Sequence, residues 1–338
     1  MTSEKTLALP PFGTSFGETM TVASWEGGAW STPSRRPVGP LSLHPGAHVL
    51  HYGSSCFEGL KAYRSVDGVV RLFRPDRHVA RLRGSAERLW LPVPPAELAL
   101  DMIVQAVEAN LDQVPPTPGS LYIRPTLIGT AANIGAAGSP TTEALLYVLT
   151  SPVGDYFADG VAPLRIAVEQ ERRRTTEQFG AVKTGANYAM ALGATMEARA
   201  AYDVAQVLFA PEGRVQETGA SNVMLISADR VVTPPADGSV LEGVTRSSLL
   251  TLAAARGLTV EERVLTVEEL VAWCEHGEVA LSGTAAVLAP VGTLIVDGAE
   301  VTVGDGRAGR HTLELREALI ETQVGKVEDV HGWTLPVG

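Results

Sequence analysis

Gly180-Ala-Val-Lys-Thr-Gly-Ala-Asn-Tyr188 is the stretch from which the fold and chemistry of this chain are best interpreted. Lys183 is one of only four lysines, against 23 arginines, and is the only charged residue in the stretch. Its Gly and Ala neighbours would let a ligand approach closely, and burial disfavours the ammonium form of an amine. Such an amine is a candidate Schiff-base nucleophile for an aldehyde cofactor. The alternative, an exposed loop lysine, is the commoner case for this residue type.

The segments around Lys183 predict intermixed strands and helices. A helix is expected from about Asn187 to Ala201, which is rich in Ala, Met and Leu. The alternating segment Leu164–Glu169 is expected to be a strand. Other expected strands cover 69–73, 145–150, 206–210, 222–226 and 278–281, and other expected helices cover 76–89, 96–110, 243–257 and 267–274. This mixture predicts an α/β or α+β fold.

The length of 338 residues predicts two domains, because it exceeds the usual size of a single core. Ser151-Pro-Val-Gly-Asp-Tyr-Phe157 follows a strand-like segment, and its Pro and Gly make it the best linker in the chain. We expect a smaller N-terminal α/β domain over 1–150, a linker loop over 151–160 and a larger C-terminal domain over 161–338.

Composition excludes several classes of function. The net charge of -11 argues against nucleic-acid and anionic-membrane partners. No stretch approaches the ~20 apolar residues of a membrane helix, and residues 1–10 do not resemble a signal peptide, so a cytoplasmic protein is expected. Cys56 and Cys274 are too few for a disulfide framework. The histidines are scattered and no HExxH occurs, so no metal is expected. No Walker loop occurs, and no GxGxxG follows one of the expected strands.

Two turns could bind an anion beside a lysine-bound cofactor. Pyridoxal phosphate needs a phosphate site and a carboxylate at its ring nitrogen. Gly243-Val-Thr245 at a predicted helix start and Ser282-Gly-Thr-Ala285 after a predicted strand offer backbone N–H groups and hydroxyls. Each turn alone is also typical of an ordinary helix cap. Together they would form a phosphate cradle that an arginine completes.

With these residues in view, the chain resembles the branched-chain amino-acid aminotransferases, which are fold-type IV pyridoxal-phosphate enzymes. The similarity runs from Phe12 to about Trp333. The stretches that carry it are Leu43-His-Pro-Gly46, His51-Tyr-Gly-Ser-Ser-Cys-Phe-Glu-Gly-Leu-Lys-Ala-Tyr63, Leu121-Tyr-Ile-Arg-Pro125, Ser151-Pro-Val-Gly-Asp-Tyr156, Lys183-Thr-Gly-Ala-Asn-Tyr188, Glu217-Thr-Gly-Ala-Ser-Asn222 and Ser282-Gly-Thr-Ala-Ala286. The resemblance implies a two-domain fold with pyridoxal 5'-phosphate in the cleft between the domains.

The resemblance assigns three principal cofactor contacts. Lys183 matches the Schiff-base lysine, and Glu217 matches the partner of the pyridine nitrogen, where a carboxylate lets the ring absorb electrons. Arg81 matches the phosphate-binding arginine, whose planar fork can hold two oxygens. Further cofactor contacts are implied for Tyr188, Val244, Thr245 and Thr284. Without the resemblance, Glu217 would be interpreted as structural and Arg81 as part of a solvated, arginine-rich helix face.

The resemblance implies that one pocket accepts both an aliphatic side chain and the second carboxylate of glutamate. Alternation along a strand predicts Tyr122 and Arg124 on one face. The resemblance gives Tyr122 the α-carboxylate and Arg124 the distal carboxylate. It also implies an apolar wall from Phe57 and Tyr156, a contribution of Tyr52 from the neighbouring subunit, and substrate contacts from Thr284 and Ala285.

The function implied is a cytoplasmic, homodimeric aminotransferase for leucine, isoleucine and valine, with 2-oxoglutarate and glutamate as the other pair. Within the same fold, a D-amino-acid aminotransferase or an aminodeoxychorismate lyase would share Lys183 and Glu217, but Tyr122-x-Arg124 and the N-terminal extension favour the branched-chain group. A scaffold that has lost catalysis is disfavoured by the intact lysine, glutamate and arginine. Animal members often carry a Cys-x-x-Cys pair where this chain has Ala286 and Ala289, so no redox switch is expected.

Overall fold

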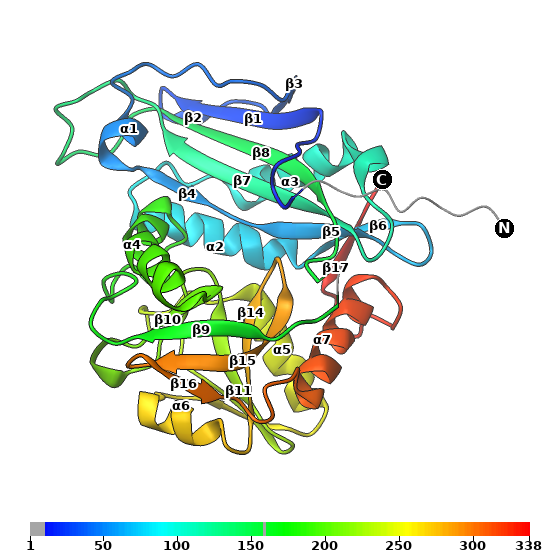
Figure 1. The fold of residues 1–338 in the computed structure, drawn as a ribbon. Helices are drawn as coiled ribbons and strands as arrows, with labels where there is room; N and C mark the ends of the chain where they lie inside the picture. Colours follow the sequence, from blue (N-terminus) through cyan, green and yellow to red (C-terminus); the bar gives the residue numbers. More distant parts are fainter. Residues whose placement is uncertain (1–10, 158–159) are drawn as a thin grey trace. The chain divides into compact units, whose positions relative to one another are not determined.

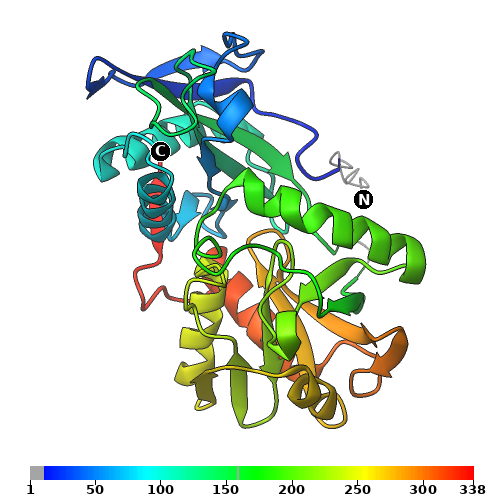
Figure 2. The same ribbon diagram turned by 90° about the vertical axis from the view of Figure 1, so that its left-hand side faces the viewer.

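The computed structural model describes residues 11–157 and 160–338 (Figures 1 and 2). The chain divides into two units, the first comprising Met1–Tyr156 with Thr322–Gly338 and the second Phe157–Glu321. Residues 1–10, on which the signal-peptide interpretation rests, and residues 158–159 of the expected linker lie outside the described residues. The predicted mixture of strands and helices is confirmed in both units.

The first unit combines a nine-stranded antiparallel sheet with helices. Its strands are β1 (Thr19–Glu26), β2 (Ala29–Trp30), β3 (Ser34–Pro37), β4 (Ser55–Phe57), β5 (Leu60–Arg64), β6 (Val70–Phe73), β7 (Ser120–Gly129), β8 (Ala144–Val153) and β17 (Thr334–Val337). Its helices are α1 (His48–Tyr52), α2 (Pro75–Arg88), α3 (Ala96–Glu108) and the 3-10 turn η1 (Leu111–Gln113). The strand order is β17-β6-β5-β7-β8-β1-β2, with β3 beside β1 and β4 beside β7.

The two faces of this sheet carry different residues, because side chains alternate along each strand. One face packs against α2 and α3, where Leu121 and Ile123 of β7 join Leu82 and Met102 of the helices in one core. The opposite face carries the alternate residues of β4, β5 and β7, namely Phe57, Lys61, Tyr122, Arg124 and Thr126. The predicted substrate residues of this sheet therefore lie on the face that the two helices leave uncovered.

The end of the chain corrects the expected domain boundary. Residues 322–338 belong to the first unit, because β17 pairs antiparallel with β6. The expected assignment of 161–338 to one domain missed this return, and the two units are nearly equal in length. The expected linker also begins too early, since Ser151, Pro152 and Val153 extend β8 by pairing with Tyr122, Leu121 and Ser120 of β7, respectively.

The second unit is a mixed sheet with helices on both faces. Its strands are β9 (Leu164–Glu169), β10 (Gln206–Phe209), β11 (Asn222–Ile226), β12 (Arg230–Thr233), β13 (Thr259–Glu262), β14 (Glu278–Gly283), β15 (Val287–Val296) and β16 (Ala299–Thr302). Its helices are α4 (Gly185–Tyr202), α5 (Val244–Ala255), α6 (Val267–Trp273) and α7 (Arg310–Gln323), with the 3-10 turn η2 (Pro211–Gly213). The order is β10-β9-β15-β14-β11-β12-β13, with β16 beside β15.

Alternation again decides which helix covers which face. Ala167 and Phe209 pack against Ala191 of α4, whereas the neighbouring Ile166 and Leu208 belong to the core beneath α6. The strand β9 has the predicted bounds, and α4 begins two residues before the predicted helix. The segment with Lys183 thus leads directly into a helix anchored on the sheet.

The cysteines are free and buried, with Cys56 in the first unit and Cys274 in the second. Burial raises the pKa of the Cys274 thiol to about 11, and burial raises that of Cys56 well above its ordinary value. Among the described residues, no helix is long and apolar enough to cross a membrane. That part of the chain also contains no cluster of three His, Cys, Asp or Glu side chains able to hold a metal.

Candidate active site

Lys183 lies at the end of a loop that closes onto the start of α4. Its Nζ donates a hydrogen bond to the Tyr188 hydroxyl at 3.0 Å, and Tyr188 stands in the first turn of the helix. The loop needs glycine at 180, because a Cβ there would lie 2.2 Å from backbone atoms of Ser239. The amide of Ala181 donates to the Gly238 carbonyl in the same contact. Two predicted cofactor residues are thereby brought together.

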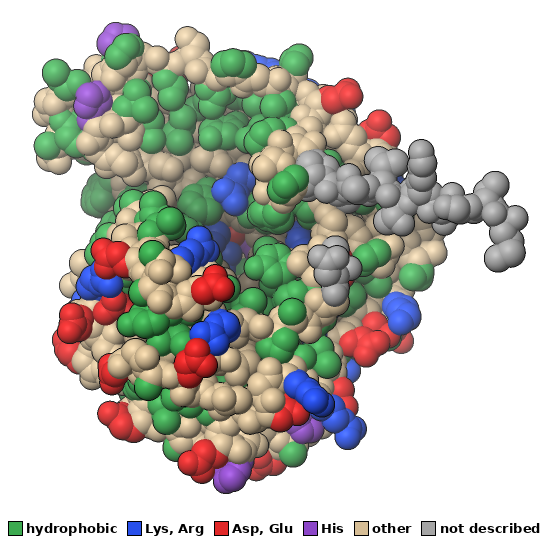
Figure 3. All heavy atoms as spheres, viewed as in Figure 1, with side chains coloured by type: hydrophobic (Ala, Val, Ile, Leu, Met, Phe, Trp, Pro, Cys, Tyr) green, Lys and Arg blue, Asp and Glu red, His purple; other side chains and the backbone are tan. Residues whose placement is uncertain are grey.

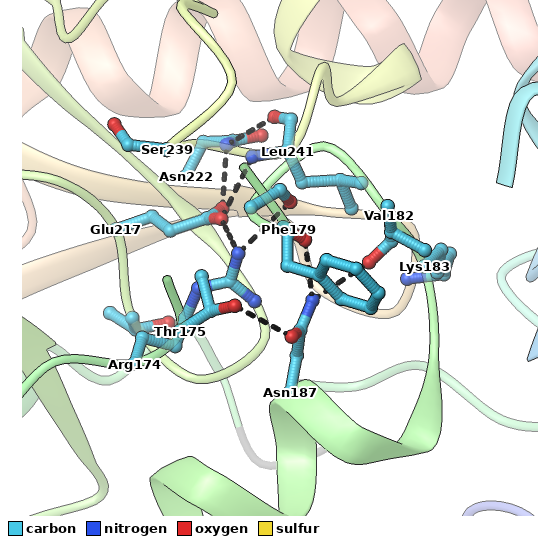
Figure 4. Close-up of polar contacts among 12 residues, drawn as sticks. Arg174, Thr175, Phe179, Val182, Lys183, Asn187, Glu217, Asn222, Ser239 and Leu241 are labelled. Atoms are coloured by element: carbon cyan, nitrogen blue, oxygen red, sulfur yellow. Dashed lines mark hydrogen bonds and ion pairs between the residues drawn. The ribbon is translucent and has the colours of Figure 1, made fainter. Parts of the chain in front are cut away.

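Asn187 braces this loop from inside α4 (Figure 4). Its side-chain amide donates to the carbonyls of Phe179 at 2.9 Å and Val182 at 2.8 Å. Its carbonyl oxygen accepts from the Thr175 hydroxyl at 2.8 Å. All three bonds involve a buried amide, so they tie the segment that precedes Lys183 to the helix that follows it.

Glu217 is a buried carboxylate held by donors from three segments (Figure 4). Its Oε1 lies 2.6 Å from Nη2 of Arg174 and accepts from the Leu241 amide at 2.8 Å. Its Oε2 accepts from the Asn222 side-chain amide at 2.9 Å. The Glu217 and Arg174 side chains are only 4% and 5% exposed. These donors stabilise the ionised carboxylate and fix its orientation.

The two turns predicted as a phosphate cradle lie on neighbouring elements. Asn222 pairs in register with Ser282, and a Cβ at Gly243 would lie 2.1 Å from Oδ1 of Asn222. The start of α5, with Val244 and Thr245 in its first turn, has no side-chain cap. Asn222 thus links Glu217, the start of α5 and the end of β14.

The hairpin after β14 is tight. Gly283 pairs with Val287, so Thr284 and Ala285 lie in the three-residue loop between them. Val287 has φ of +65°, a strained value for a β-branched residue. The buried Ser282 hydroxyl has no hydrogen-bond partner among the described residues. This hydroxyl is able to hydrogen-bond a polar group or a water at this turn.

In the first unit, Arg81 projects from α2 and pairs with Glu58. Arg81 Nε lies 2.7 Å from Oε1 of Glu58 and donates to it, and Nη2 donates to Oε2 at 2.9 Å. His78, one turn earlier, lies with Nδ1 2.7 Å from Oε2. Glu58 is completely buried. The predicted phosphate-binding arginine therefore has a fixed guanidinium plane.

Tyr122 and Arg124 meet on one face of β7, as alternation predicts. Arg124 Nη2 donates to the Tyr122 hydroxyl at 2.8 Å, and the guanidinium carbon lies 4.6 Å from the centroid of the Phe57 ring. The ring of Phe12 packs edge-on against Tyr122 at 4.9 Å. Arg124 Nε is buried and has no hydrogen-bond partner among the described residues. This group combines an apolar wall with an arginine suited to an anion.

The remaining two aromatic residues lie at the margins of the first unit. Tyr52 ends α1 and donates from its hydroxyl to the Ile134 carbonyl. Tyr156 is the last residue of the unit's long segment and is 48% exposed. The predicted site residues thus form two groups, one in each unit. Most of the predicted cofactor residues lie in the second unit, and most of the predicted substrate residues lie in the first.

The family model described as "Amino-transferase class IV" matches residues 55–294, which include twelve of the thirteen predicted site residues. The chain belongs to the class IV aminotransferases. Tyr52 alone lies before the matched range. The family resemblance and the fold type predicted from the sequence motifs are confirmed.

Relatives within this aminotransferase family extend over nearly the whole chain. A probable branched-chain-amino-acid aminotransferase of Streptomyces coelicolor is 42% identical, over 97% of this chain and 92% of the relative. The branched-chain-amino-acid transaminase 1 of Bacillus subtilis is 40% identical, over 96% and 94%. The solved structure of the branched-chain amino acid aminotransferase of Escherichia coli has a TM-score of 0.77 at 28% identity, over 92% of this chain and 98% of that one.

Three residues that contact predicted site residues were not themselves predicted as site residues. Arg174 ends the run Glu171-Arg-Arg-Arg174, which looks like a solvated charge cluster in sequence. Glu58 and Asn222 lie inside the motif stretches but were given no role. The only signal for Glu58 is its place one residue after Phe57. Arg174 is buried and the adjacent Arg172 and Arg173 are not, but three consecutive arginines in a sequence give no sign of this difference.

We expect Arg174→Gln to destabilise the apoprotein by roughly 3–5 kcal/mol, because it leaves the buried Glu217 carboxylate without its cation. The matched control is Arg173→Gln. Arg173 pairs at the surface with Glu212 at 2.5 Å and Glu177 at 3.5 Å, so its loss should cost no more than about 1 kcal/mol. Urea unfolding followed by circular dichroism measures both. Equal losses for the adjacent arginines would contradict the importance of the buried pair.

Proposed function

We propose that this chain transfers the amino group of leucine, isoleucine or valine to 2-oxoglutarate, with pyridoxal 5'-phosphate as cofactor. The proposal rests on two features of the second unit. The Lys183 amine lies 3.0 Å from the Tyr188 hydroxyl, and the buried Glu217 carboxylate is held by Arg174. The names of the relatives support the branched-chain substrates. Another branched-chain amino acid aminotransferase of similar structure, solved in complex with N-(5'-phosphopyridoxyl)-L-glutamate, supports glutamate as the other amino acid.

The residues present fit pyridoxal phosphate. Lys183 supplies the amine, and Glu217 supplies an ionised carboxylate for a protonated ring nitrogen. The uncapped start of α5 and the unsatisfied Ser282 hydroxyl are suited to phosphate oxygens. We assign the phosphate to Val244, Thr245 and Thr284 with Arg81. Tyr188 would then hold the ring hydroxyl.

The protein residues divide the work around the cofactor. When bound, pyridoxal phosphate supplies the electron-accepting ring on which amino and oxo groups are exchanged. The Lys183 amine anchors the cofactor and then carries the proton to and from the substrate α-carbon as general base and acid. Tyr188 orients that amine through its hydroxyl. Glu217 keeps the ring nitrogen protonated, because its own charge is held in place by three donors.

Substrate selection is assigned to the uncovered face of the first sheet. Tyr122 would bind the α-carboxylate, and Phe57 would contact an aliphatic side chain together with Tyr156 and Ala285. Arg124 would bind the distal carboxylate of glutamate, which is supported by its buried Nε lacking a partner among the described residues. A charged carboxylate and an aliphatic chain could then use the same pocket, because the Arg124 guanidinium also lies over the Phe57 ring.

The functional form would be a homodimer in the cytoplasm. Figure 3 shows hydrophobic side chains gathered on the face of the first unit that carries β1, β7 and β8. Leu50 and Ile134 of the same unit are apolar side chains that are 59% and 70% exposed. Both residues lie near Tyr52, whose hydroxyl donates a hydrogen bond to the Ile134 carbonyl. A partner subunit bound at these residues would contact Tyr52. The two free, buried thiols are compatible with a reducing compartment.

Lys183→Ala should leave a folded protein that has lost at least about 100-fold in steady-state transamination of leucine with 2-oxoglutarate, since a positioned proton carrier contributes 10²–10⁴-fold. Lys326→Ala, which removes an exposed lysine, is the control and should keep full activity. Glutamate formation in a coupled assay measures both variants. Substantial turnover by Lys183→Ala would refute the assigned role.

Arg124→Gln should weaken glutamate and 2-oxoglutarate by roughly 1.5–3 kcal/mol relative to leucine, because only the distal carboxylate loses a charge-assisted hydrogen bond. The two half-reactions are measured separately, by the concentration dependence of the cofactor spectrum. Arg35→Gln, which breaks the surface pair with Glu108, controls for a general effect of losing an arginine. Equal weakening of leucine and glutamate would count against this division.

A further inference from the structure

Glu58 is a charged group that the proposed reaction does not use. Its carboxylate lies between β4 and β5, is fully buried, and accepts four hydrogen bonds. Two come from Arg81 and one from His78 on the same side of α2, and the fourth comes from the Gly59 amide at 3.1 Å. The Glu58 amide itself donates to the Pro125 carbonyl of β7 at 2.9 Å.

Burying this charge is costly, so stability alone is a weak reason for its presence. Burial by itself would raise the pKa of the Glu58 carboxyl, but the charges of Arg81 and His78 outweigh it, and the pKa lies well below its usual range. Glu58 is therefore ionised at neutral pH. Its negative charge is matched within the cluster and is fixed by it.

A carboxylate beside a phosphate-binding arginine has two opposing effects on phosphate. Its charge repels the phosphate and partly cancels the attraction of Arg81. Its hydrogen bonds fix Arg81, because a guanidinium is planar and two bonds at Nε and Nη2 determine where its other N–H groups point. A fixed fork loses less entropy on binding. If removing the Glu58 carboxylate weakens phosphate binding, its effect on the orientation of Arg81 is the larger one. If removing it strengthens phosphate binding, its electrostatic repulsion is the larger one.

Gly59, the residue after Glu58, separates the Glu58 side chain from the predicted substrate residue Tyr122. A Cβ at Gly59 would lie 2.0 Å from the Tyr122 hydroxyl, so the backbone at Gly59 approaches the substrate side closely. The Glu58 side chain instead turns toward α2. A change confined to the Glu58 side chain should therefore alter phosphate recognition and leave Tyr122 in place.

We propose that Glu58 is a positioning residue that aims the Arg81 guanidinium at the cofactor phosphate, and that this geometric effect exceeds its electrostatic opposition. The inference rests on the proposed function, because the phosphate is that of pyridoxal phosphate. Glu58 contacts neither cofactor nor substrate in this account. It acts through Arg81, with His78 holding the second side of the carboxylate.

The test compares two ligands that differ only in the phosphate. Full-length apoprotein is titrated with pyridoxal phosphate and with pyridoxal, and the ratio of the two dissociation constants gives the phosphate contribution. Glu58→Gln removes the charge at nearly constant shape, and Glu58→Asp keeps the charge but shortens its reach by one methylene. Glu87→Gln, on an exposed position of α2, is the control. Thermal unfolding verifies that each variant is folded.

Both Glu58 variants should lower the preference for pyridoxal phosphate over pyridoxal by on the order of tenfold, through weaker phosphate binding with pyridoxal affinity unchanged. In an Arg81→Gln background, Glu58→Gln should have no further effect on the ratio. An electrostatic role would instead raise the preference in Glu58→Gln and leave Glu58→Asp unchanged, which would overturn the proposal. An unchanged ratio, equal losses for both ligands, or failure of both variants to fold would also overturn it.

The same titrations distinguish an error in the proposed function from an error in the role of Glu58. If the wild-type protein binds no pyridoxal phosphate, the cofactor assignment is wrong. If it prefers pyridoxal phosphate and Arg81→Gln keeps that preference, the phosphate role of Arg81 is wrong. A wild-type preference that Arg81→Gln abolishes but Glu58→Gln leaves intact would contradict only the inference about Glu58.

Discussion

The ion pair between Glu217 and Arg174 is the interaction on which the second unit depends. A buried carboxylate must be matched by charge and hydrogen bonds, and meeting this requirement brings together the segment before Gly180, the strand β11 and the loop at Leu241. Arg174 also donates to the Gly180 carbonyl at 3.1 Å, so the same guanidinium is tied to the loop that carries Lys183. Carboxylate and amine are therefore positioned by one network, shown in Figure 4.

The first unit also contains a buried carboxylate, that of Glu58, which is matched by basic side chains. Glu58 is matched by Arg81 and His78, which ties the helix α2 to the sheet, while the opposite face of that sheet presents Tyr122 and Arg124. Alternation along β7 separates these two tasks, because neighbouring side chains point to opposite faces. Leu121 and Ile123 of β7 join the core, and Tyr122 and Arg124 lie on the uncovered face.

Much of this arrangement could be predicted from sequence because the signals are local. The period of β9, the composition of α4 and the alternation of Tyr122 with Arg124 each determine a structure within a few residues. The return of the chain end to β6 could not be predicted, since strand pairing over such a separation leaves no local pattern. Arg174 and Glu58 were missed for a related reason: burial and partners are set by distant segments.

Lys183 and Glu217 together are proposed to serve transamination of branched-chain L-amino acids. The most direct measurement mixes the protein, loaded with pyridoxal phosphate, with single amino acids in the absence of any oxo acid, and follows the cofactor absorbance through one half-reaction. We expect a stoichiometric spectral change with L-leucine, L-isoleucine, L-valine and L-glutamate and none with their D-enantiomers. A response to the D-amino acids alone, or none to the branched L-amino acids, would contradict it.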